Sequence, residues 1–391
     1  MPPHSVSPVV CLIMDRLSAG MLGAYGNTWV GTPCFDNLAF SSILFEQNLL
    51  TSPFIKNFYN TVWHGGAASG DALPGRFGAN GLDTLLITDE IKLKGDQSGF
   101  ADISLIAQDS DPNDSCTETE KFFAAAADQL ARVDKSALVW LHSNCLGRDW
   151  DAPYEMRKWY AAEEDPPPPK SQDAPHFLTG PDTDPDEILG WVQAYAAQVS
   201  HWDQCLGHFL DVIDDHSIFK DALLVVGGCR GFPLGEHRAV GAGSLDNPDC
   251  ELYGELLHFP MLCRVPGGPH AVRHSGLMQP EDLFAMMRQW LDQDGKDAAL
   301  LGTNFLEWEN FSRSAVISEH SNGSWSVRTP AWFFRYPGQA DKSGELYLKP
   351  DDRWEVNNVA DRCDDVVQAI ERLYRDAKAG KPIEPIDSLL I

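Results

Sequence analysis

Continuous runs of apolar residues, rather than alternating ones, mark the first two thirds of the chain. Four such runs stand at 8–14 (PVVCLIM), 84–88 (TLLIT), 137–142 (ALVWLH) and 222–228 (ALLVVGG). A strand that is covered on both faces is apolar at every position, as in a parallel sheet between two layers of helices. The runs therefore predict the central strands of an α/β sheet.

Segments with helical spacing lie between these runs. The clearest begins at Pro185, with Asp184 as its N-cap, and extends to about residue 213. A second helix is predicted from Thr117, where Glu120 completes a capping box, and a third from about Pro280. The stripe of the first helix consists of Ile188, Val192, Tyr195, Val199, Trp202, Leu206, Phe209 and Ile213. Strands alternating with helices indicate an α/β fold.

The pattern changes after about residue 303. Short strands are predicted at 315–319, 325–336 and 345–348, and a final helix at about 364–377. We therefore expect an α/β domain over residues 1–302 and a small α+β subdomain over 303–391, which contains an antiparallel sheet and one helix. The Pro-rich stretch 163–185 can form neither a helix nor a central strand, so it is predicted to be a surface excursion bordering a site.

Charge and cysteine content narrow the classes of function. The 57 Asp and Glu residues outnumber the 30 Lys and Arg residues, which gives a formal net charge of −27. Such a chain lacks the basic surface that nucleic acids and anionic membranes require, so neither is expected as a partner. Its nine scattered cysteines and the absence of a signal-peptide pattern at the N-terminus predict a cytoplasmic protein with reduced thiols.

Several segments resemble the sulfatases of the alkaline phosphatase superfamily. Asp15 follows the first apolar run, and LGAYG (22–26) and TPCFDNLA (32–39) follow in the order typical of that family. Later segments keep the family's order: YAAQVSHWDQCLGHFLDVI (195–213), LLVVGGCRGFPLGEH (223–237), LHFPMLCRVPG (257–267) and GELYLKPDDRWEVNNVA (344–360). The likeness implies a large mixed, mostly parallel sheet with helices on both faces, followed by a smaller antiparallel sheet with one helix.

The resemblance also implies a divalent cation such as calcium, held by carboxylates. The family's acidic pair after the first strand is Asp15 followed by Arg16 in this sequence. The Asp-His or Asp-Asn pair after a later strand is replaced by Cys229 and Arg230. Because two guanidinium groups and a soft sulfur replace hard oxygen ligands, we expect no metal, and Asp15 is the one clear remnant ligand.

The nucleophile that the resemblance implies is a cysteine converted to formylglycine. In the matching stretch TSPFIKNFYNTVWHG (51–65), Ile55 stands at the nucleophile and Tyr59 at the activating arginine, and the motif's proline is replaced by Asn57. Ile55 has no nucleophilic atom, so no formylglycine is expected.

The remaining polar residues of this pocket allow more than one interpretation. Asp15 is expected to pair with Arg16 or Arg230, and Cys229 to be a small buried hydrophobe whose pKa would fall if the arginines are close. Glu236 and His237 are either a surviving acid/base pair or a loop anchor. Lys56, Arg16 and Arg230 together could form a pocket for sulfate, phosphate or carboxylate.

The sequence thus favours a sulfatase-like protein that has lost sulfate-ester hydrolysis, a pseudoenzyme that binds a small anion or a protein partner. The alternative is an active hydrolase of sulfuric or phosphoric esters with a non-standard site around Asp15, Cys229, Glu236 and His237.

Overall fold

The computed structural model describes residues 7–66, 72–95, 99–107, 116–241, 251–292, 313–339 and 341–383. Its centre is an eight-stranded sheet with the order β10-β2-β9-β7-β1-β5-β3-β4. The strands are β1 (Val9–Met14), β2 (Ile43–Leu49), β3 (Asp83–Thr88), β4 (Asp102–Leu105), β5 (Ala137–Ser143), β7 (Leu223–Gly228), β9 (His258–Arg264) and β10 (Val272–Met278). Neighbouring strands are parallel except where β9 pairs with β2 and β7. The four apolar runs are the strands β1, β3, β5 and β7, as predicted.

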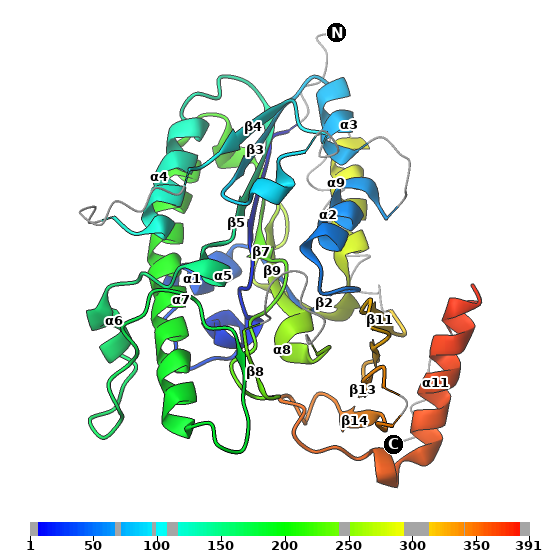
Figure 1. Ribbon diagram of the computed structural model, residues 1–391. Helices are drawn as coiled ribbons and strands as arrows, with labels where there is room; N and C mark the ends of the chain where they lie inside the picture. The colour runs from blue at the N-terminus through cyan, green and yellow to red at the C-terminus, as the bar shows by residue number, and fades with distance from the viewer. Residues whose placement is uncertain are drawn as a thin grey trace.

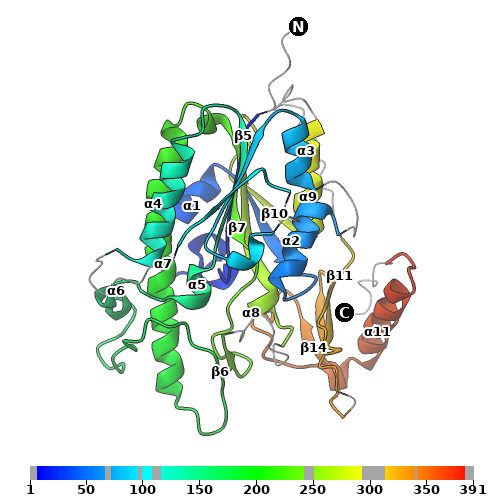
Figure 2. The same cartoon turned by 45° about the horizontal axis from the view of Figure 1, so that its top comes forward.

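Helices cover both faces of this sheet (Figures 1 and 2). One layer contains α1 (Pro33–Phe40), α4 (Glu118–Leu130) and α7 (Pro185–Asp215), with the short α5 (Cys145–Arg148) and α6 (Tyr154–Lys158) beside them. The other contains α2 (Ile55–His64), α3 (Leu73–Ala79) and α9 (Pro280–Asp292). Each layer has its own hydrophobic core against the sheet, so the predicted burial of the central strands on both faces is confirmed.

The predicted helix starts are confirmed at α4 and α7. The Thr117 side chain accepts a hydrogen bond from the Glu120 N–H, and the Glu120 side chain accepts one from the Thr117 N–H, which completes the capping box. Asp184 caps α7 by accepting from the N–H of Asp186. Both helices then bury their apolar stripes in the same core.

A separate four-stranded antiparallel sheet follows, with the order β11-β12-β13-β14. Its strands are β11 (Val316–Glu319), β12 (Trp325–Arg328), β13 (Trp332–Tyr336) and β14 (Glu345–Leu348), and α11 (Asp364–Lys378) packs on one face (Figure 1). The other face joins the main core through Val316, Phe333 and Tyr347. The predicted class of this region is confirmed, whereas the predicted domain boundary at 302–303 lies outside the described residues.

The Pro-rich stretch contributes only β6 (Phe177–Leu178), which pairs with β8 (Ala239–Val240) in the loop after β7. A last short helix, α8 (Gly254–Leu257), leads into β9. In the part of the chain that the structure describes, no helix is long and apolar enough to cross a membrane.

Candidate functional site

The carboxyl ends of β1 and β7 lie side by side and place Asp15 beside Cys229 and Arg230. In the parallel register Met14 is opposite Gly228, so the residues that follow each strand are neighbours. The Cys229 N–H donates to the carbonyl of Met14 (3.2 Å), which extends the pairing past the strand ends. Ligands of open α/β sheets bind at this edge. The edge is therefore the candidate site, as the sequence predicted.

Asp15 is closed off by a bidentate ion pair with Arg230. Arg230 Nε donates to Asp15 Oδ1 and Nη2 donates to Oδ2, both at 2.7 Å. The two side chains are only 4% and 1% exposed. Burial alone would raise the pKa of the Asp15 carboxyl, but the charge and hydrogen bonds of Arg230, together with the charge of Arg16, outweigh it and lower that pKa. Asp15 is thus an ionised and paired carboxylate at neutral pH.

Arg16 is a second buried cation close to Asp15, in addition to Arg230. Its Nε lies 3.7 Å from Asp15 Oδ2, and its Nη1 donates to the carbonyl of Gly147 (3.3 Å). The backbone of Arg16 has φ +64°, a left-handed conformation that costs a non-glycine residue about 1 kcal/mol. A hydrogen bond from the Tyr195 hydroxyl to the Arg16 carbonyl (2.6 Å) helps to hold it. Asp15 was predicted to pair with Arg16 or Arg230, and it lies within ion-pair distance of both.

The lack of a side chain at Gly147 leaves room for the Arg16 side chain. A Cβ atom at this position would lie 2.9 Å from Arg16 Cδ and 2.4 Å from Asn144 Oδ1. Both approaches are closer than non-bonded atoms allow. The α5 segment and the Arg16 side chain are thus fitted to each other.

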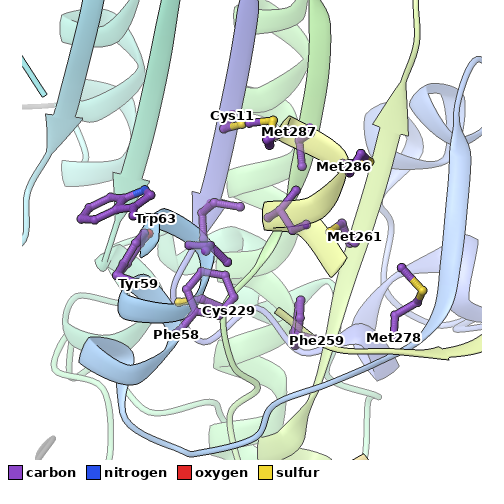
Figure 3. Close-up of a cluster of buried hydrophobic side chains, with 14 of the residues drawn as sticks. Cys11, Phe58, Tyr59, Trp63, Cys229, Phe259, Met261, Met278, Met286 and Met287 are labelled. Carbon is purple, nitrogen blue, oxygen red and sulfur yellow. The ribbon is translucent and has the colours of Figure 1, made fainter. Parts of the chain in front are cut away.

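Ile55 and Tyr59 belong to the hydrophobic core instead of facing a reacting group. Ile55 is the first residue of α2 and is 5% exposed, and Tyr59 is 3% exposed. Both lie in the core cluster that also contains Phe58 and Cys229, and Figure 3 shows the last two close to Tyr59. An aliphatic side chain therefore occupies the helix start that faces the strand ends.

Cys229 behaves as a buried, protonated thiol. Its Sγ donates to Asp15 Oδ1 at 3.3 Å, and it is 1% exposed. Burial raises the pKa of this thiol well above its ordinary value, and the Asp15 charge raises it further, against the opposing effect of Arg230 and Arg16. The arginines are close and their charges act to lower this pKa, as predicted, but desolvation outweighs them. The prediction that Cys229 is a small buried residue is confirmed.

Lys56 does not share the enclosure of the two arginines. Its side chain is exposed on the first turn of α2, whereas Arg16 and Arg230 are each 4% exposed. The predicted pocket of three cations is therefore not assembled. The two buried arginines donate instead to Asp15 and to the backbone carbonyls of Gly147 and Pro53.

Glu236 and His237 lie in a different cavity from Asp15. This cavity has a volume of about 430 Å³ and lies between the main sheet and the C-terminal sheet; we name it the junction cavity. Its lining comes from the loops after β1 and β7, from β2, from α8 and from residues 349–355, and neither Asp15 nor Cys229 lines it. Glu236 Oε2 accepts from the Leu234 N–H (2.9 Å), which anchors the loop. The four residues of the predicted non-standard site are therefore split between two places.

Sequence reasoning missed several polar residues at the same sheet edge. His142, at the end of β5, shares a 2.6 Å hydrogen bond through Nδ1 with the Tyr59 hydroxyl. Burial, with the charge of Arg230, lowers the pKa of His142 to about 4 against the opposing effect of Asp15, so the ring is neutral. His176, from the Pro-rich stretch, lies 3.5 Å from Arg16 Nη1. The prediction that this stretch borders the site is thus confirmed.

Asp89, after β3, was also missed. Its Oδ2 accepts from the Ser143 hydroxyl (3.1 Å) and its Oδ1 from the Asn144 N–H (2.8 Å). Burial raises its pKa to about 6, although these hydrogen bonds and the charge of Arg148 act in the opposite direction. The signal was available, since Asp89 and His142 stand at the carboxyl ends of predicted parallel strands, where Asp15 was found.

The donor atoms at this edge do not suit a divalent cation. Both Asp15 oxygens accept from Arg230, the neighbouring sulfur is a protonated thiol, and the adjacent side chain is a cation. Hard divalent ions need several free oxygen ligands. Within the described ranges, no group of three or more His, Cys, Asp or Glu side chains could hold a metal ion.

The chain resembles known proteins both in its sequence and in its fold. The family model described as Sulfatase matches residues 7–293. No curated protein matches the sequence. The fold is similar to that of BT4656 in complex with its substrate D-glucosamine-2-N,6-O-disulfate (TM-score 0.74, 14% identity, covering 97% of this chain and 100% of that chain). It is also similar to the phosphonate monoester hydrolase of Agrobacterium radiobacter (TM-score 0.71, 13% identity, 95% of each chain) and to BT1596, a 2-O GAG sulfatase (TM-score 0.70, 14% identity, 99% of this chain and 96% of that chain).

Proposed function

Because this chain belongs to the sulfatase family of the alkaline phosphatase superfamily, we propose that it is a non-hydrolytic member that acts by binding. The observation that carries this proposal is the bidentate pair of Asp15 with Arg230, both buried, at the edge where the family's metal site would lie. A tethered guanidinium here neutralises the carboxylate and leaves no position open for an exchangeable ion or a substrate oxygen.

The nucleophile position supports the same proposal. Nucleophilic catalysis needs an oxygen, sulfur or nitrogen atom with an adjacent activating group. Ile55 supplies only hydrocarbon at the start of α2, and the polar groups of Tyr59 and His142 are hydrogen-bonded to each other. The thiol of Cys229 is held protonated by burial and by Asp15, so it is a poor nucleophile.

We also propose that the protein works in the cytoplasm. The eight cysteines within the described ranges are all free thiols, and five of them are buried. Reduced thiols are typical of cytosolic proteins. A small molecule or a protein remains the proposed partner.

The test combines metal analysis with turnover. The purified full chain is incubated with calcium, magnesium, manganese or zinc, dialysed and analysed for bound metal, and then assayed with aryl sulfate and aryl phosphate esters. We expect substoichiometric metal and no turnover above that of the Asp15→Asn variant. One equivalent of metal together with turnover that Asp15→Asn abolishes would overturn the proposal and establish the ester hydrolase instead.

A further inference from the structure

The junction cavity contains a buried carboxyl group with an unsatisfied oxygen. Glu255, on α8, has a side chain that is only 10% exposed, and it lines the cavity. Its Oε1 lies 3.3 Å from His237 Nδ1. Its Oε2 is buried and accepts no hydrogen bond from a donor in the part of the chain that the structure describes. Because a buried polar atom without a partner is costly, this oxygen indicates a ligand position.

The neighbouring histidine reaches Glu255 only through Nδ1. His237 Nε2 lies 3.0 Å from the backbone carbonyl of Glu355, and a carbonyl oxygen can only accept, so Nε2 carries a hydrogen. The ring is stacked on Tyr253 at 3.6 Å between centroids, which fixes its orientation. In the neutral ring Nδ1 is then bare and faces Glu255. An additional proton is needed between these two groups whenever no external cation is present.

Carboxyl groups outnumber cations in this corner of the cavity. Glu236 and Glu355 also line it, and Glu251 lies nearby. Lys349 pairs with Glu355 (2.8 Å) and Arg335 pairs with Glu251 (3.1 Å). Among the described residues, no lysine or arginine forms an ion pair with Glu236 or Glu255. Burial raises the pKa of Glu255, and the hydrogen bond that its protonated form makes with Glu236 raises it further, as do the charges of Glu236, Glu355 and Glu251.

The cations on the other walls are already engaged. Arg273 pairs with Glu46 (2.6 Å), and Arg328 donates to Gln47 (3.2 Å) and to backbone carbonyls. Arg353 donates to the carbonyl of Tyr25 (3.1 Å). Their guanidinium groups therefore satisfy acceptors of the protein and leave the excess of carboxyl groups around Glu255 in place.

Two tryptophans form the rim of the cavity. Trp29 and Trp354 both line it, yet they are 44% and 52% exposed. Aromatic rings attract cations through their negative faces, and the Arg353 guanidinium already lies 5.0 Å from the Trp354 ring. An aromatic rim and a corner with an excess of carboxyl groups both suit a positively charged organic molecule.

We propose that the junction cavity binds a small organic amine, whose ammonium group donates to Glu255 and Glu236 in place of the proton that these carboxyl groups share, and whose apolar part lies toward Trp29 and Trp354. Binding ionises Glu255 and releases the proton that it shares with its neighbours. The volume of about 430 Å³ admits a molecule of this kind. This function goes beyond the loss of hydrolysis and does not depend on it, since the cavity is separate from Asp15.

The test is calorimetric titration of the full chain with 2-phenylethylamine, with 2-phenylethanol as the neutral analogue of the same shape. We expect binding of the amine at least about tenfold tighter than that of the alcohol, as for a hydrogen bond to a charged group. The affinity should rise with pH, because the carboxylate form of Glu255 is the binding form. The measured heat should depend on the ionisation enthalpy of the buffer, which reports proton release.

Substitutions localise the site. Glu255→Gln should weaken amine binding about tenfold or more and remove the buffer dependence, and Glu236→Gln should weaken it in the same direction. The matched control is Glu281→Gln on α9, because Glu281 also has a raised pKa and a buried oxygen without a partner but does not line the cavity. Thermal unfolding of each variant establishes that it is folded, and Glu236→Gln serves as the test if Glu255→Gln does not fold.

Three results would overturn the proposal. These are the absence of heat with the amine at millimolar concentration, equal binding of the alcohol, and an affinity that falls as pH rises. Equal weakening by Glu281→Gln would likewise exclude the junction cavity as the binding site. None of these outcomes bears on metal binding or ester turnover, so the two proposals can fail separately.

Discussion

Removing the Arg230 side chain should destabilise the protein by an amount that the geometry sets. In Arg230→Met the Asp15 carboxylate, 1% exposed, loses both of its 2.7 Å hydrogen bonds and its bidentate partner. Two unit charges about 4 Å apart interact by about 4 kcal/mol at an effective dielectric constant of about 20. Breaking a buried ion pair from one side costs about 3–5 kcal/mol. Because Arg16 stays 3.7 Å from the carboxylate, we expect the low end, about 3 kcal/mol.

Urea unfolding at neutral pH measures this loss, and a second pair provides the control. Arg264 pairs with Asp214 at 2.6 Å, but that aspartate is 53% exposed. Arg264→Met should therefore cost less than about 1 kcal/mol. The double variant Asp15→Asn/Arg230→Met should recover more than half of the stability that Arg230→Met loses, since it buries no unpaired charge.

The pH dependence has a definite sign. The folded pKa of Asp15 is lowered, so the stability that the ion pair contributes is present above the ordinary carboxyl pKa and is lost as pH falls through the folded value. In Arg230→Met the carboxyl becomes easier to protonate, so the difference from the wild type should narrow in acid. A loss below about 1 kcal/mol, or a double variant no more stable than Arg230→Met, would refute the view that Asp15 is a buried charge held by this arginine.

Three further predictions concern the same sheet edge. Gly147→Ala should destabilise the fold by about 1–3 kcal/mol, because the new Cβ would lie 2.9 Å from Arg16 Cδ, and chemical denaturation measures this. The pKa of Asp89 is raised to about 6, so the wild-type free energy of unfolding should fall by up to about 3 kcal/mol as pH rises from about 4 to about 6. Unfolding curves across that range should show no such fall for Asp89→Asn. In the native protein Cys229 should react with iodoacetamide at least about tenfold more slowly than the exposed Cys116, as peptide mass spectrometry of partially labelled protein can measure.

Much of the fold follows from local pattern. The strands β1, β3, β5 and β7 are apolar at nearly every position because both of their faces are covered, and that leaves a clear signal in sequence. The capped starts of α4 and α7 are equally local. The strand β2 was missed, since its central Glu46 and Gln47 break the apolar run and instead line the junction cavity. Glu46 and Gln47 line the cavity because of where β2 lies in the sheet, which the residues of β2 alone do not reveal.

Those parts of the candidate site whose chemistry depends on a single residue type could be predicted from the sequence. Asp15 beside two arginines indicates an ion pair, and Ile55 excludes a nucleophile there whatever surrounds it. The junction cavity could not be predicted, because Glu236, Glu255 and Glu355 come from three distant segments that only the packing of the C-terminal sheet brings together. The net shift of the Cys229 pKa could not be predicted for a related reason, since the burial that outweighs the two arginines depends on the whole core.

The ion pair of Asp15 with Arg230 differs in kind from the metal site that we propose it replaces. A divalent ion exchanges with solvent and keeps a position open for substrate, whereas Arg230 is covalently tethered and permanently charged. Asp15 therefore contributes to stability at all times, and Arg16, Gly147 and Tyr195 are fitted around it as structural elements. The binding function that we propose then uses another cavity, and the junction cavity, with a buried carboxyl oxygen that accepts from no donor and an open aromatic rim, has properties that the closed edge lacks.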